Sequence, residues 1–65
     1  MRDVASIAAK LRSVRRATGI TQAELAQLAG TSVRTIRTIE TATGNPSVRA
    51  VIAVANVLGL QLVAR

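Results

Sequence analysis

The sequence contains no cysteine, no histidine and no aromatic residue, and each absence excludes a class of function. Without cysteine or histidine there is no disulfide, no soft-metal site and no thiol or imidazole catalyst. Without aromatic rings there is no platform on which unpaired bases can stack. Single-stranded nucleic acid and RNA loops are therefore poor candidates for a ligand.

Acidic residues are scarce as well, because Asp3, Glu24 and Glu40 are the only three among 65 residues. Hard-metal sites and paired-carboxylate catalysis both need several carboxylates that converge on one point. The sequence therefore predicts that the protein is not an enzyme and that it uses no metal and no cofactor.

Positive charge is abundant by comparison. Nine Lys and Arg residues give a formal net charge of +6 on a chain that is 49% hydrophobic. A disordered basic tail would be poor in aliphatic residues, so this composition indicates a folded basic domain. Such a charge predicts a polyanionic partner, nucleic acid first and an anionic membrane second. All the cations except Lys10 are Arg, whose forked guanidinium matches phosphate and guanine.

No segment of the sequence has the character of a membrane span or a signal peptide. The longest apolar stretch, residues 48–64, is interrupted by Arg49, Asn56 and Gln61. The first residues lead into an amphipathic segment rather than an apolar one. The expected location is therefore the cytoplasm.

Hydrophobic spacing and stop signals divide the chain into four short helices without a linker, so residues 1–65 are interpreted as one domain. The first helix is expected over residues 4–18. The second runs from a cap at Thr21 to Gly30, and the third from a cap at Thr31 or Ser32 to near Glu40. The fourth is expected over residues 48–58, after a cap at Ser47.

The C-terminal residues 60–64 are aliphatic and partly alternating, which favours a strand over a fifth helix. One strand alone leaves its backbone groups unpaired, so pairing with its copy in a second subunit is expected, with Leu60 and Leu62 in the dimer interface. A frayed tail is the alternative. The expected fold class is all-α: a compact bundle of four short helices with a C-terminal strand that pairs across a dimer.

Residues 22–40 have the pattern of a helix-turn-helix, two short helices joined by a tight turn that contains glycine. Ala26 is small where the next helix is expected to cross, and Gly30 suits the reversal of the chain. Ile36 and Ile39 supply the apolar contact between the two helices. Packing of this kind is expected to leave four residues free of the core: Val33, Arg34, Arg37 and Thr38.

The sequence resembles the Cro/repressor type of helix-turn-helix domain, also called the xenobiotic-response-element family, over about residues 7–60. The matching residues are Leu11, Arg15, Gly19-Ile20-Thr21-Gln22, Glu24-Leu25-Ala26, Gly30, Ser32, Ile36, Ile39-Glu40, Pro46-Ser47 and Leu58-Gly59-Leu60. The resemblance implies a compact helical bundle that binds double-stranded DNA as a homodimer. It further implies repression of transcription from a palindromic operator. A protein of this type is expected in a bacterium or phage, associated with the nucleoid when bound to DNA.

Domains of this type place the start of the second motif helix in the major groove. Arg34 is the first choice for reading a base, because its guanidinium matches O6 and N7 of guanine. Val33 is expected against a thymine methyl group, with partial burial as the alternative. Arg37 and Thr38 complete the expected base-contacting set, and Arg37 alternatively contacts the DNA backbone.

Contacts to DNA phosphates are expected at the starts of the helices and in the loop after the motif. The resemblance assigns a phosphate-binding role to Gln22, where the helix N-terminus adds free N–H groups and a positive dipole. The other candidate donors to phosphate are Thr31, Ser32, Thr43 and Asn45. Capping and turn formation are the alternative roles of these side chains.

The remaining charged residues are expected to have other roles. The resemblance implies that Arg15 and Glu40 form a buried structural ion pair. Lys10, Arg12 and Arg16 are expected on the outer, solvated face of the first helix. Arg49 begins the fourth helix, where a cation opposes the helix dipole, so it is a candidate for contact with the DNA backbone or an acidic partner.

The C-terminal residues 59–65 are similar to the end of Hip-type antitoxins, whose terminal strand pairs across the dimer. That likeness implies the autoregulating antitoxin of a toxin–antitoxin operon, with a toxin protein such as a Hip-type kinase as a second partner. Two alternatives belong to other classes: a toxin-neutralising interaction module with little or no DNA binding, and a cationic membrane-active peptide. The glycine stops and capping motifs favour defined helices and so argue against the peptide.

Overall fold

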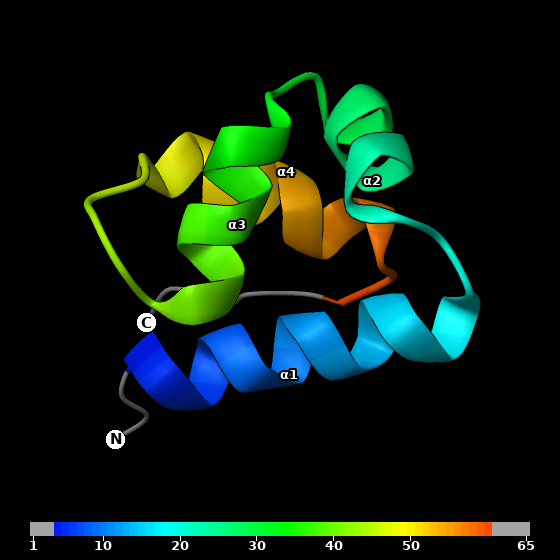
Figure 1. The fold of residues 1–65 in the computed structure, drawn as a ribbon, viewed down its shortest axis with the longest axis horizontal. Helices are drawn as coiled ribbons and strands as arrows, with labels where there is room; N and C mark the ends of the chain where they lie inside the picture. Colours follow the sequence, from blue (N-terminus) through cyan, green and yellow to red (C-terminus); the bar gives the residue numbers. More distant parts are fainter. Residues whose placement is uncertain (1–3, 61–65) are drawn as a thin grey trace.

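The structure is a computed structural model that describes residues 4–60, and the regular secondary structure in this part of the chain is all α-helix. The helices are α1 (Val4–Thr18), α2 (Gln22–Ala29), α3 (Val33–Thr41) and α4 (Val48–Val57). In Figure 1, α1 runs along one side of the molecule, α2 and α3 lie above it, and α4 lies behind α3. The predicted bundle of four helices is confirmed, and none of the described helices is long and apolar enough to cross a bilayer.

The core is built from all four helices. Its largest fully buried side chains are Leu11, Leu25, Ile36 and Val54, which come one from each helix. Helix α3 packs against α1, α2 and α4 and is therefore the central element. Because three neighbours hold it, the direction of α3 and the face that it exposes are fixed by the packing of the whole domain.

Three helices begin at the caps that the sequence predicts. Thr21, Ser32 and Ser47 each accept a hydrogen bond from the backbone N–H three residues later. At α2 the bond is reciprocal, because the Thr21 N–H also donates to Glu24 Oε1 at 2.8 Å. The predicted capping box is thus confirmed, and it supplies partners for two N–H groups that the helix itself leaves free.

The helices also end in a similar way, close to a residue in the left-handed conformation. After α2, Gly30 has φ +71 and the Thr31 N–H donates to Ala26 O at 2.9 Å. After α4, Gly59 has φ +76. After α3, however, the left-handed residue is Ala42 with φ 57, which the sequence pattern did not single out.

The strand predicted over residues 60–64 lies, apart from Leu60, outside the described residues, as does Leu62. Leu60 is not part of a strand, because its N–H donates to Ala55 O at 2.8 Å and closes the end of α4. Its side chain packs, partly buried, against the core. The all-α part of the predicted fold class is therefore confirmed, whereas the terminal strand is not supported.

Gly30 has the backbone conformation that a reversal of the chain needs, whereas Gly44 is the glycine that allows a close approach. A Cβ on Gly30 would meet nothing within 4 Å, so Gly30 is required by its positive φ and not by a tight helix crossing. A Cβ on Gly44 would lie 2.9 Å from Thr38 Cγ2, so the loop after α3 packs closely onto that helix. Ala26 is buried between the helices, as expected.

Candidate nucleic-acid interface

Helix α3 has one apolar face and one basic face. Ile36 and Ile39 are buried in the core, whereas Arg34 and Arg37 are exposed. The spacing of three residues within each pair places its members on one side of a helix. The helix has nine residues, a length of about 13 Å. Two arginines one turn apart therefore line the outer surface of the most enclosed helix in the domain.

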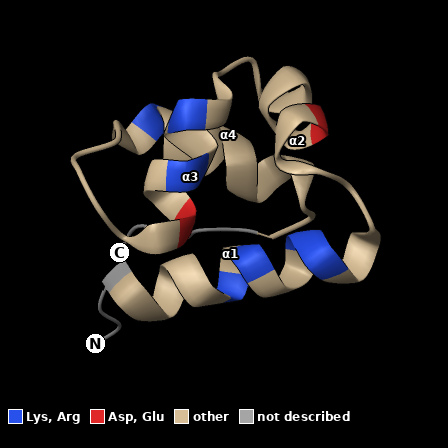
Figure 2. Ribbon diagram, in the orientation of Figure 1, with Lys and Arg blue, Asp and Glu red and all other residues tan. Residues whose placement is uncertain are grey.

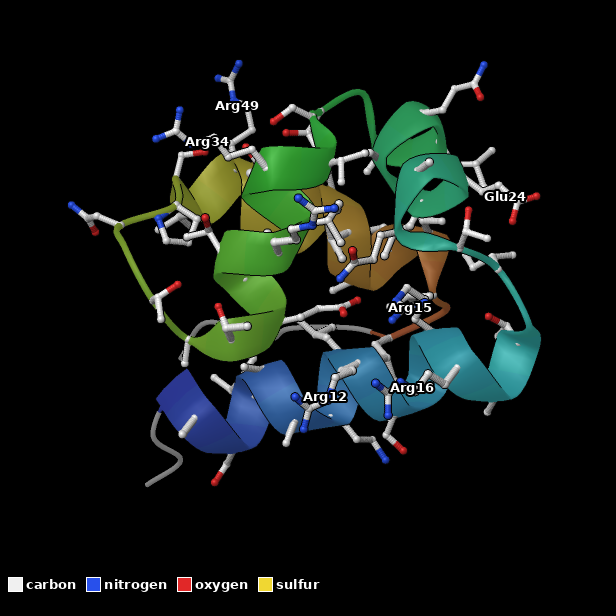
Figure 3. All side chains as sticks on the ribbon, viewed as in Figure 1. Arg12, Arg15, Arg16, Glu24, Arg34 and Arg49 are labelled. Atoms are coloured by element: carbon white, nitrogen blue, oxygen red, sulfur yellow. The ribbon has the colours of Figure 1, made fainter. Side chains whose placement is uncertain are left out.

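The starts of α3 and α4 lie toward the same end of the molecule in Figure 1. The loop of residues 42–47 runs back along α3, so both helices begin at the same end of the molecule (Figure 1). Arg34 and Arg49 both project into solvent there (Figure 3). Two helix N-termini add their partial positive charge to the two guanidinium groups, which makes this end attractive to an anion.

The acidic residues do not neutralise this surface. Of the two acids among residues 4–60, Glu24 accepts from the Thr21 N–H and lies at the far side of α2 (Figure 3). Glu40 is buried at 3% exposure. Figure 2 shows basic residues on α1, α3 and α4, with one acid on α2 and one at the end of α3. The exposed arginines of α3 thus keep their full attraction for phosphate.

The structure contains the ion pair that the resemblance implied. Arg15 Nε lies 2.5 Å from Glu40 Oε2, and Arg15 Nη2 lies 3.2 Å from Glu40 Oε1. The third nitrogen, Nη1, donates to Ile20 O at 3.0 Å. The two side chains are 11% and 2% exposed, so this bidentate pair joins α1, the α1–α2 connection and α3 inside the domain. All three guanidinium nitrogens of Arg15 are therefore hydrogen-bonded within the domain.

Gln22 extends this pair to the surface. Its amide nitrogen donates to Glu40 Oε1 at 3.2 Å, and its amide oxygen accepts from Arg37 Nε at 3.4 Å. Arg15, Glu40, Gln22 and Arg37 thus form one continuous series, named here the Gln22 network. The sequence indicated Gln22 only as a phosphate contact or part of the cap. The bond to Arg37 joins residues 15 apart in sequence, so no local pattern could have revealed it.

The four residues expected to lie free of the core do not all do so. Arg34 and Arg37 are exposed, but Val33 and Thr38 are half-buried. Val33 packs against the core, and the Thr38 hydroxyl donates to Arg34 O at 2.9 Å. The expectation of a side chain free of the core is therefore wrong for Val33, which has the partial burial named as its alternative. Thr38 is half-buried but is not packed against the core cluster. All four base-contacting roles stay predictions.

Most of the hydroxyl groups expected to contact phosphates are hydrogen-bonded within the domain. Ser32 Oγ accepts from the Thr35 N–H at 3.1 Å and lies 3.0 Å from Thr35 Oγ1. Thr43 Oγ1 lies 2.8 Å from Thr41 Oγ1, at the opposite end of α3 from Ser32. Thr31 is half-buried, and Asn45 is exposed in the loop. The structure thus divides these candidates between the two ends of α3.

The basic residues of α1 are not all on its outer face. Lys10 and Arg16 are exposed, but Arg12 is half-buried and lines an open groove with Glu40 and Thr41. The expectation that Arg12 lies on the outer face is therefore wrong. Its side chain lines the groove between α1 and the end of α3.

The comparison with known families agrees with this geometry. Residues 6–65 match the family described as a helix-turn-helix domain. The chain belongs to this family of DNA-binding domains, in which α2 and α3 with the turn at Gly30 form the motif. No curated protein matches the chain.

Proposed function

We propose that this protein is a sequence-specific transcriptional repressor of the Cro/repressor type, a binding protein rather than an enzyme. It inserts the start of α3 into the major groove of double-stranded DNA and acts in the cytoplasm. The observation that carries the proposal is the exposed pair Arg34 and Arg37 on the central helix. A guanidinium at the start of such a helix can read guanine, and the surrounding positive charge binds phosphates without regard to sequence.

The exposure of these side chains supports a division of roles within the site. In this proposal Arg34 reads a base, and Arg37 contacts a base or the backbone one turn further on. Ser32, at the start of α3, and Asn45, exposed in the loop before α4, contact flanking phosphates. Phosphate contacts position the domain, whereas base contacts specify the operator.

The decisive experiment is selection of bound duplexes from a random pool at a stated salt concentration. Wild type is expected to enrich a palindrome. The Arg34→Ala variant is expected to lose preference at particular positions, because a bidentate arginine–guanine contact provides about 1–3 kcal/mol of discrimination. Arg16→Ala on α1 is the matched control and is expected to keep the wild-type motif. Enrichment of no duplex, or an unchanged motif with Arg34→Ala, would contradict direct readout by this residue.

We propose further that the protein acts as a homodimer. A two-fold dimer sets two recognition helices about 34 Å apart, one turn of DNA. Support comes from the apolar side of α4, where Val48 is 73% and Ile52 is 42% exposed. These residues are four apart and lie on one face of the helix. They offer apolar area that a single subunit leaves uncovered. The sequence predicts Leu60 and Leu62 for the same interface.

Truncation tests the dimer. Deletion of residues 60–65 is expected to convert dimer to monomer and to lower stability, because Leu60 also closes α4. Deletion of residues 61–65 keeps that closing bond and is expected to affect mainly the association. Light scattering gives the molar mass of each species. A truncated protein that remains dimeric would exclude the C-terminal residues from the interface.

The finer version of the proposal is an autoregulating antitoxin that also binds a toxin protein, such as a Hip-type kinase. The likeness of residues 59–65 to Hip-type antitoxins supports it. Co-expression with the product of the adjacent gene tests it: the expected result is relief of growth arrest. Growth arrest that continues despite co-expression would contradict the antitoxin role, and the protein would then be a stand-alone repressor.

A further inference from the structure

We propose that Gln22 is a positioning residue, which orients Arg37 for DNA through the Gln22 network. The proposal rests on the proposed function and deepens it. Its basis is the continuous set of hydrogen bonds that begins at the buried Arg15–Glu40 pair and ends at an exposed guanidinium. Gln22 is the only link between the buried part and the surface part of this network among the described residues.

The orientation of the Gln22 amide follows from the chemistry of its two neighbours. The Glu40 carboxylate, paired with Arg15, accepts hydrogen bonds and donates none, so the Gln22 amide nitrogen must face it. The amide oxygen must then face outward. There it meets Arg37 Nε, a group that only donates, at 3.4 Å. The buried ion pair therefore determines which atom of Gln22 is presented to Arg37.

The contact with Gln22 leaves most of the Arg37 guanidinium available. It uses Nε, and no other described residue bonds to the terminal nitrogens Nη1 and Nη2. These two nitrogens form a fork that matches a phosphate or a guanine edge. At 3.4 Å this bond is longer than the usual range for N–H···O and is therefore weak. It restricts the direction of the guanidinium without holding the group away from a ligand.

The benefit of such a restriction is entropic. A free, exposed arginine side chain samples many rotamers, and ordering them on binding reduces affinity. Gln22 reduces the number of rotamers that the Arg37 side chain samples before DNA binds. The alternative role, in which Gln22 itself contacts a phosphate, does not depend on Arg37, and this difference makes the two roles separable.

A double-mutant cycle on an enriched duplex separates them. Gln22→Met keeps the length of the side chain and removes the amide, and Arg37→Ala removes the guanidinium. Gln22→Met is expected to weaken binding about three- to tenfold when Arg37 is present and less than twofold in the Arg37→Ala background. Gln27→Met, on the exposed side of the same helix, is the control and is expected to change nothing. Equal losses in both backgrounds would overturn the positioning role.

A second measurement requires no DNA. In the free protein, the Nε–H signal of Arg37 in NMR spectra is expected to exchange faster with solvent in Gln22→Met than in wild type. The Arg34 Nε–H signal is the internal control and is expected to stay the same. An unchanged Arg37 signal would refute the proposal.

These results are distinct from a failure of the proposed function. A wild-type protein that enriches no duplex would overturn DNA binding, and with it the purpose assigned to Arg37. The NMR comparison would still show whether Gln22 orders this side chain. A loss of overall fold in Gln22→Met is detected by circular dichroism, and Gln22→Ser then serves as a second variant that lacks the reach to both neighbours.

Discussion

Ala42 occupies a conformation that suits glycine. It has φ 57 and ψ 34 at the end of α3, and it is the only residue other than glycine with a positive φ in the described part of the chain. Its N–H donates to Ile39 O at 3.3 Å, and the next N–H, of Thr43, donates to Thr38 O at 3.1 Å. These bonds close α3 although the left-handed region is unfavourable for a side chain with a Cβ.

Replacement of Ala42 by glycine is expected to stabilise the protein by about 0.5–1 kcal/mol, because the strain of the Cβ disappears while the bonds remain. Chemical denaturation measures the free energy of unfolding. Ala9→Gly, at an exposed position inside α1, is the matched control and is expected to destabilise by a similar amount. If Ala42→Gly proves destabilising too, relief of backbone strain is not the dominant effect at this position.

At the scale of the element, α2 shows how a short helix is stabilised by its caps and by burial of one face. It has eight residues, a length at which an isolated helix does not form in water. Thr21 and Glu24 supply bonds at its start, and Gly30 closes its end. Leu25 and Ala26 bury its inner face. Since Gln22 follows the cap directly, the geometry of the cap also determines where the Gln22 network begins.

Thr21→Ala is expected to lower the free energy of unfolding by about 1 kcal/mol, because a helix N–H loses its side-chain acceptor. Thermal denaturation followed by circular dichroism provides the measurement. Ser13→Ala, at an exposed position within α1, serves as the control, and a neutral or slightly stabilising effect is expected since alanine favours helix. Equal stabilities of the two variants would show that the cap contributes nothing.

At the scale of the whole molecule, the distribution of charge is the main feature. The net charge of +6 is carried by a domain whose two described acids are both engaged, one in a cap and one in the core. The exposed arginines therefore act together on a polyanion. Arg49 belongs to this group because its side chain points outward at the same end of the view as Arg34 (Figure 3).

Arg49→Ala is expected to weaken binding to all duplexes alike, since a phosphate contact carries no sequence information. The slope of log affinity against log salt concentration is expected to fall by about 1, because one phosphate is no longer neutralised by the protein. Lys10→Ala, an exposed cation on α1, is the control and should leave the slope unchanged. A changed sequence preference with Arg49→Ala would instead assign Arg49 to a base.

The sequence by itself determined the helices and their starts. The bounds of α1 and the caps Thr21, Ser32 and Ser47 were predictable, because capping and stop signals act between residues at most a few positions apart. The division of α3 into a buried and a basic face was also predictable, since it follows from helical periodicity. The same local rules could not reveal Ala42, because alanine carries no signal for the left-handed conformation.

Only the tertiary structure decided which side chains of the site are exposed and which are buried or hydrogen-bonded within the domain. Val33 is partly covered by the core, and Thr38 lies against Gly44, although the sequence pattern placed both with Arg34 on the outer side of α3. Gln22 lies between Glu40 and Arg37, which are 18 and 15 residues away in sequence. Contacts over such separations depend on how α2 crosses α3, and that crossing results from the packing of all four helices together.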